Sequence, residues 1–123
     1  MSDPDFVILY VDDAVAAATF YAALLGRPPV ESSPTFAMFA LESGVMLGLW
    51  SKRGVEPAVS VSGNGGELAF SVRDCEAVDA RHADWRRRGL TIVQSPVDMD
   101  FGRTFVAVDP DGHRLRVFAP SAA

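Results

Sequence analysis

The chain contains an internal repeat, and this repeat limits the possible folds more than any other feature. Positions 7–13 match positions 68–74 at an offset of 61 residues, each being an apolar run that ends in an aspartate. Positions 44–50 match positions 112–118 at an offset of 68 residues, each being a glycine followed by a strand-like run. A unit of this size is too small to cover its own sheet, so we expect two similar units to pair.

The first repeat has the pattern of a β-α-β-β-β unit. The run at 6–11 is rich in β-branched and aromatic residues and predicts a strand. Asp13 is a good helix N-cap, because its carboxylate accepts the free amide hydrogens of the first turn. The alanine-rich segment 14–25 then predicts a helix. Two strands are expected at 36–41 and 45–50, joined by a turn that contains a glycine.

The second repeat has the same order of predicted elements. Asp74 takes the N-cap position, and Asp109-Pro110-Asp111-Gly112 predicts a tight turn before the last strand. The predicted elements are a strand at 67–72, a helix at 75–88, and strands at 91–93, 104–108 and 114–118. The fold class is therefore α+β, with two βαβββ modules.

We expect one domain over residues 1–123. Module one covers about 5–52 and module two about 67–120, with a glycine-rich connector at about 53–66. A short extended stretch is expected at 58–61 within the connector.

Composition excludes several classes of protein. The chain has 123 residues, 49% of them apolar and 22% charged, which is typical of one globular domain. The net charge of −5 argues against a nucleic-acid partner. No apolar run is long enough to span a bilayer, and the acidic N-terminus is unlike a signal peptide, so we expect a cytoplasmic protein without membrane insertion. A single cysteine, Cys75, excludes an internal disulfide and a multi-cysteine zinc site.

Four short motifs, taken in this order with the repeat, resemble the glyoxalase/bleomycin-resistance/extradiol-dioxygenase (vicinal oxygen chelate) superfamily. They are Val11-Asp12-Asp13, Phe20-Tyr21 with Leu25-Gly26, the segment 101–105, and Asp109-Pro110-Asp111-Gly112-His113. The resemblance covers nearly the whole chain. It implies that the two modules form curved sheets around a cavity, and that two chains form a homodimer with each cavity lying between the subunits.

The same resemblance implies four positions at which the enzymes of the superfamily hold a divalent metal with His or Glu. In this sequence they map to Phe6, Gly48, Glu67 and Arg116. Phe and Gly offer no side-chain ligand, and Arg repels a cation. We therefore expect no metal, no cofactor and no catalytic residue. The alternative is a metal-dependent glyoxalase- or dioxygenase-type enzyme, or a metal-free catalyst using Tyr10 or Glu67; a structural or regulatory module is a third possibility.

A closer resemblance is to the phenazine-antibiotic resistance proteins, a drug-binding branch of the superfamily. It is carried by the segments 47–51, 55–57, 101–105 and 109–117. It implies sequestration of a planar aromatic antibiotic, of phenazine or quinoxaline/quinoline type, without chemistry. Such binding would confer self-resistance or aid delivery to an exporter.

The ligand site expected from this resemblance is built on aromatic residues. Trp50 is expected to stack on the ligand, opposite Phe101 or Tyr10; a core or interface position is the alternative for Trp50. Phe36 and Phe39 lie three apart in one strand, so alternation puts them on opposite faces, and the sequence leaves open which one faces the cavity. Phe39 is included in the expected site.

Polar residues complete the expected site. Arg103 either holds a ligand carboxylate or carbonyl, or pairs with Asp98 or Asp100. Glu67 and Arg116 are expected to form an ion pair in the place of the metal, or to hydrogen-bond the drug. Ser51, which follows Trp50, and Gly102, which precedes Arg103, are also included in the expected ligand-binding set. An unusual backbone angle is expected at Gly102.

Overall fold

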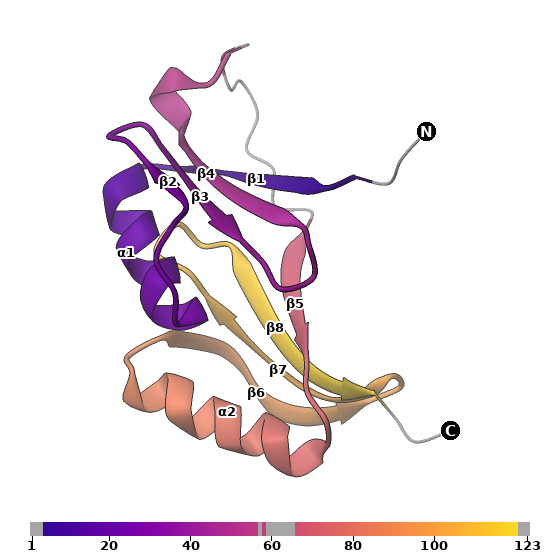
Figure 1. Ribbon diagram of the computed structural model, residues 1–123. Coiled ribbons are helices and arrows are strands. Elements are labelled where there is room, and N and C mark those ends of the chain that lie inside the picture. Colours follow the sequence, from indigo (N-terminus) through magenta and orange to yellow (C-terminus); the bar gives the residue numbers. More distant parts are fainter. Residues whose placement is uncertain (1–3, 57, 59–65, 121–123) are drawn as a thin grey trace. The chain divides into compact units, whose positions relative to one another are not determined.

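The computed structural model describes residues 4–56, 58 and 66–120 (Figure 1). The chain divides into two compact units, Met1–Ser62 and Gly63–Ala123, called unit one and unit two below. Each unit has a four-stranded mixed sheet with one helix on one of its faces (Figure 1). This arrangement is the α+β fold with two βαβββ-like modules that the repeat predicts.

Unit one contains sheet A, with the strand order β1-β4-β3-β2. Strand β1 pairs with β4 in parallel, and the other neighbours are antiparallel. The elements are β1 (Phe6–Val11), α1 (Ala14–Leu25), β2 (Glu31–Ser32), β3 (Phe36–Ala40), β4 (Met46–Ser51) and the short 3-10 helix η1 (Lys52–Gly54).

Helix α1 begins and ends where the sequence predicts. The Asp13 carboxylate accepts hydrogen bonds from the amides of Val15 and Ala16, and Gly26 ends the helix in a left-handed conformation with φ 70°. The side of α1 that meets β3 and β4 is made of small residues and one tyrosine, which lets the helix approach the sheet closely. These buried residues are Ala14, Ala17, Ala18 and Tyr21.

Unit two contains sheet B, with the equivalent strand order β5-β8-β7-β6. Helix α2 packs on β6, β7 and β8 and buries Val78 and Trp85. The elements are β5 (Glu67–Ser71), α2 (Cys75–Arg87), β6 (Thr91–Met99), β7 (Gly102–Val108) and β8 (Arg114–Pro120).

The pairing registers confirm the repeat residue by residue. In sheet A, Ile8 lies beside Gly48 in the neighbouring parallel strand. In sheet B, Ala69 lies beside Arg116. These partners differ by the offsets read from the sequence, 61 residues for the first strand and 68 for the last. Gly48 and Arg116 therefore occupy equivalent places in the two units.

The largest difference from the expected elements is in β6, which continues to Met99, whereas the sequence predicts a strand only at 91–93. Its register shifts twice against β7, and Pro96 lies within it. Proline and bulges are tolerated because β6 is an edge strand. The sequence did not predict β2 or η1, and positions 59–61 of the expected extended stretch lie outside the described residues.

Candidate ligand-binding faces

Side chains alternate across each strand, so each sheet has a face covered by its helix and a helix-free face. Residues that are paired in register share a face, so the strand pairing assigns each residue of the sheet to one of its two faces. The helix-free face of sheet A is almost entirely apolar. Its residues are Phe6, Ile8, Tyr10, Phe36, Met38, Ala40, Met46, Gly48 and Trp50, together with the charged Glu31 of the edge strand β2.

Three aromatic residues form one row across this face. Trp50 in β4 pairs with Tyr10 in β1 on one side and with Phe36 in β3 on the other. The rings of Phe36 and Trp50 meet edge to face, with centroids 6.4 Å apart. The Trp50 Nε1 atom lies beside η1, since a β-carbon on Gly54 would be 3.6 Å from it. The row therefore offers an aromatic surface in which Trp50 is held between the neighbouring strand β3 and the turn η1.

Gly48 lies two residues before Trp50 in β4, and the ring of Phe36 covers it. A β-carbon at Gly48 would lie 3.0 Å from Cζ of Phe36 and 3.4 Å from Cγ1 of Ile8. The space left by the missing side chain is thus filled by an aromatic ring and an aliphatic chain.

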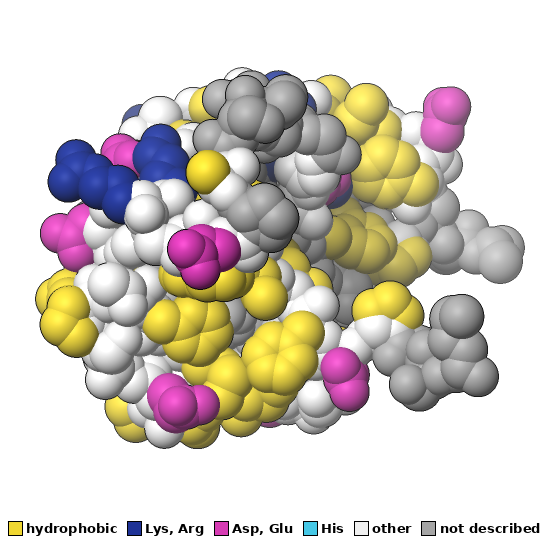
Figure 2. Space-filling view, turned by 90° about the horizontal axis from the view of Figure 1, so that it is seen from above, with side chains coloured by type: hydrophobic (Ala, Val, Ile, Leu, Met, Phe, Trp, Pro, Cys, Tyr) yellow, Lys and Arg dark blue, Asp and Glu magenta, His cyan; other side chains and the backbone are white. Residues whose placement is uncertain are grey.

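Strand β1 exposes large apolar side chains. Tyr10 keeps 46% of its surface accessible, and Phe6 and Ile8 are exposed to a similar degree. The space-filling view also shows apolar side chains reaching the surface in groups, with separate acidic side chains between them (Figure 2). Exposed apolar groups of this kind mark surfaces that bind a ligand or another protein.

Two residues of the expected site lie on the helix face of sheet A instead. Phe39 is fully buried, and its in-register partner is Leu47 in the core. Ser51 is buried and accepts a hydrogen bond from the Ala14 amide at 3.2 Å, which caps helix α1. Phe36, and not Phe39, is the phenylalanine of β3 on the helix-free face, and we leave Phe39 and Ser51 out of the proposed ligand face.

The helix-free face of sheet B carries an ion pair. Arg116 in the middle of β8 donates from Nε and Nη2 to the Glu67 carboxylate at the start of β5. Its Nη1 donates to Thr104 Oγ1 at 3.1 Å, and this hydroxyl donates to the Val117 carbonyl at 2.9 Å. The expected ion pair is therefore present, and Thr104 adds a contact that sequence reasoning missed.

Phe101 lies over the same face, next to Arg116. The Arg116 Cζ atom is 5.8 Å from the centroid of the Phe101 ring, and this ring meets Phe118 edge to face at 6.2 Å. Gly102, the next residue, has φ 139°, which confirms the unusual backbone angle predicted there. Phe118 in β8 occupies the place that Trp50 occupies in β4, 68 residues earlier.

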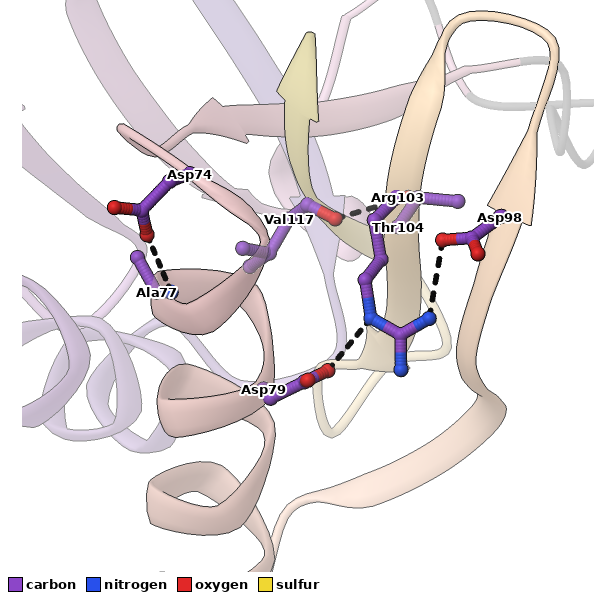
Figure 3. A network of polar contacts seen from close by, with 7 residues as sticks. All are labelled: Asp74, Ala77, Asp79, Asp98, Arg103, Thr104 and Val117. Carbon is purple, nitrogen blue, oxygen red and sulfur yellow. Dashed lines mark hydrogen bonds and ion pairs between the residues drawn. The ribbon is translucent and has the colours of Figure 1, made fainter. Parts of the chain in front are cut away.

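Arg103 lies on the opposite face of sheet B, toward α2. Its guanidinium donates to Asp79 of α2 at 2.8 Å and to Asp98 of β6 at 3.1 Å (Figure 3). Hydrogen bonds to these two carboxylates raise the pKa of Arg103 above its ordinary value. The alternative that the sequence left open, a salt bridge to Asp98, is what the structure shows, and we leave Arg103 out of the ligand site.

The four positions that the resemblance maps to the metal ligands of the superfamily do not fit a divalent cation. Phe6 has no donor atom, and Gly48 is covered by Phe36. The Glu67 carboxylate is engaged by Arg116, which carries a positive charge of its own. Among residues 4–56, 58 and 66–120, no three His, Cys, Asp or Glu side chains are grouped so as to hold a metal ion.

Comparison with known proteins agrees with this architecture. The family described as the Glyoxalase/Bleomycin resistance protein/Dioxygenase superfamily matches residues 4–117. The chain belongs to this superfamily. The phenazine antibiotic resistance protein EhpR of Enterobacter agglomerans is 27% identical over 117 residues, which cover 93% of this chain and 89% of that protein.

Solved structures of similar proteins share the fold. A protein of Agrobacterium tumefaciens with a solution NMR structure is 55% identical, with a TM-score of 0.89 over 99% of this chain and 100% of that chain. A glyoxalase/bleomycin resistance protein/dioxygenase from Nocardioides is 26% identical, with a TM-score of 0.79 over 98% of this chain and 85% of that chain. Neither helix of the described chain has the length and apolar character needed to cross a membrane.

Proposed function

We propose that this protein binds a planar aromatic natural-product antibiotic, of phenazine or quinoxaline/quinoline type, without chemically changing it. Binding would protect the cell by sequestering the drug or by passing it to an exporter. The aromatic row Tyr10, Trp50 and Phe36 is the observation that carries this proposal. Aromatic pairs contribute about 0.5–1.5 kcal/mol beyond the apolar area they bury, so a flat ring is the ligand that such a row favours.

The residues at the metal positions support binding rather than catalysis. Phe6 and the Phe36 ring over Gly48 make that part of sheet A apolar, and the charges of Glu67 and Arg116 compensate each other in sheet B. The likeness to a phenazine antibiotic resistance protein, at 27% identity over most of both chains, supports the choice of ligand class.

We further propose that the protein acts as a homodimer. The exposed apolar side chains of edge strand β1 would be costly to leave in water, and a second copy of the chain would cover them. Light scattering coupled to size-exclusion chromatography tests this part. A monomer at micromolar concentration would contradict it.

The two tryptophans of the chain allow a direct binding experiment. Trp50 lies on the proposed ligand face, whereas Trp85 is buried in unit two between Phe70 and Phe105. Phenazine and quinoxaline are titrated into the Trp85→Phe variant, in which Trp50 is the single reporter. We expect saturable quenching of its fluorescence, because a stacked ring accepts the excitation energy at contact distance.

Equilibrium dialysis then measures affinity without a tryptophan reporter. Trp50→Ala is expected to weaken phenazine binding about tenfold, through the loss of stacking and of buried apolar area. Val15→Ala, an exposed apolar position on α1, is the matched control and should leave affinity unchanged. No saturable binding of either compound, or equal affinity in Trp50→Ala, would overturn the proposal.

A further inference from the structure

The helix-free face of sheet B indicates which substituents a ligand bound to this face would carry. Resting on the proposed function above, we infer that the Glu67–Arg116 pair makes the protein prefer neutral aromatic ligands with a hydrogen-bond donor and an acceptor on one edge. A carboxamide is the simplest such group. A ring that bears a carboxylate anion in the same place binds less well.

Arg116 is held in one position by three contacts. Two of its N–H groups meet the Glu67 carboxylate, and a third meets Thr104 Oγ1 at 3.1 Å. Thr104 is in turn fixed by its own hydrogen bond to the Val117 carbonyl. A guanidinium held in this way is preorganised, so a ligand that uses it loses little side-chain entropy.

The pair retains hydrogen-bonding capacity that a ligand can reach. A guanidinium has five N–H donors, and the three contacts above use three of them. A carboxylate has about four acceptor positions, of which Arg116 occupies two. The side chains of Arg116 and Glu67 keep 18% and 30% of their surface accessible. The pair therefore offers donors and acceptors side by side.

The charges of the pair decide what kind of group it recognises. An anion near Arg116 is also near Glu67, so attraction and repulsion largely cancel while the anion still loses its hydration. A neutral amide donates to the carboxylate and accepts from the guanidinium without that loss. A metal ion in the same place would favour the opposite ligand, an anionic chelator.

An aromatic surface lies next to the pair. The Phe101 ring is 5.8 Å from Arg116 Cζ and 45% exposed, and Phe118 supports it from the sheet. A flat ring on this surface brings a substituent on its edge within reach of Glu67 and Arg116. Phe101, Glu67 and Arg116 thus match a ligand that has a planar ring and a neutral polar group on one edge.

The test compares three probes on the full chain by calorimetry at pH 7: phenazine, phenazine-1-carboxamide and phenazine-1-carboxylate. We expect the wild type to bind the carboxamide about tenfold more tightly than the carboxylate, the ratio given by one net hydrogen bond to a charged group. In Glu67→Gln the arginine is no longer neutralised, and this ratio should reverse in favour of the carboxylate.

Glu42→Gln is the matched control. It removes the same charge from another Glu–Arg pair, that with Arg27 in unit one, where the two side chains are 3.1 Å apart. Glu42→Gln should leave the ratio of carboxamide to carboxylate affinity unchanged. This control separates a local effect at Arg116 from an effect of the protein's net charge. Arg116→Gln is the second variant. The wild type should bind the carboxamide more tightly than phenazine, whereas Arg116→Gln should bind the two equally and should not gain affinity for the carboxylate. Circular dichroism checks that each variant is folded.

The possible results distinguish this inference from the proposed function. If no probe binds the wild type, the proposed function fails. If all three bind with equal affinity, or if Glu67→Gln leaves the ratio of carboxamide to carboxylate unchanged, the inference is overturned and the proposed function stands.

Discussion

The ring of Phe36 covers Gly48, so closely that a β-carbon on Gly48 would lie 3.0 Å from Cζ and 3.1 Å from Cε1 of that ring. Gly48 corresponds to a position at which relatives of this chain are expected to carry a metal ligand. Here the space above the glycine is used by an aromatic side chain, which belongs to the row that includes Trp50.

Gly48→Ala should therefore displace the Phe36 ring. We expect the free energy of unfolding to fall by about 1 kcal/mol, the lower end of the cost of overpacking, because the ring is half-buried and can shift. Phenazine affinity should fall as well, since the ring moves out of the row. In a Phe36→Ala background the same change should cost nothing, and urea denaturation of the four proteins measures this coupling. Additive effects would contradict the contact.

Ser51→Ala should affect stability and leave binding intact. The Ser51 hydroxyl accepts from the Ala14 amide at the start of α1, so its loss leaves a buried N–H without that partner. We expect a loss of about 1–2 kcal/mol in the free energy of unfolding. Phenazine affinity should equal that of the wild type, in contrast to Trp50→Ala at the adjacent position. A weaker affinity in Ser51→Ala would return Ser51 to the ligand site.

Arg103→Met should lower the melting temperature without changing ligand affinity. Arg103 joins α2 to β6 through Asp79 and Asp98, on the face away from Glu67 and Arg116. Calorimetric melting and the phenazine titration measure the two effects separately. Binding of phenazine-1-carboxamide that weakens in Arg103→Met as much as in Arg116→Gln would show that the two faces have been assigned to the wrong roles.

The turn after Trp50 gives a prediction on pH. The Lys52 ammonium is 2.8 Å from the Asp12 carboxylate and holds the pKa of Asp12 below its ordinary 3.8, mainly through a hydrogen bond and then through its charge. A carboxyl group with a lowered pKa stabilises the fold above its unfolded pKa, and this contribution disappears as the pH falls through the lowered value.

Lys52→Met should therefore raise the pKa of Asp12 toward 3.8, as followed by NMR titration of its carboxyl carbon. Arg53→Met is the control, because Arg53 lowers this pKa least among the groups that act on it. A larger rise in Arg53→Met than in Lys52→Met would contradict the assignment.

Chelation should leave ligand binding unchanged. Glu67 is engaged by Arg116, and the other equivalent positions offer no carboxylate or imidazole. We expect elemental analysis of the purified protein to find no stoichiometric Zn, Ni, Mn or Fe, and phenazine affinity to be the same with and without EDTA. A stoichiometric metal whose removal changes binding would favour the enzyme alternative.

Much of the fold could be predicted because local signals repeat. Asp13 and Asp74 both cap a helix, and the two offsets of the repeat match the pairing of Ile8 with Gly48 and of Ala69 with Arg116. The end of β6 could not be predicted in the same way. Residues 94–96 are polar or proline, and they remain in a strand only because β7 supplies a pairing partner.

The ligand faces show the same division between what the sequence predicts and what the tertiary structure decides. Alternation along a strand requires that Phe36 and Phe39 lie on opposite faces, and the sequence alone determined this much. Only the packing of α1 against β3 and β4 decided that Phe39 is the buried one. Likewise, the repeat in the sequence showed that Glu67 corresponds to Phe6 and Arg116 to Gly48. The contacts of Arg116 with Glu67 and Thr104, and of Arg103 with α2, depend on strands that are distant in sequence, and so only the tertiary structure could decide them.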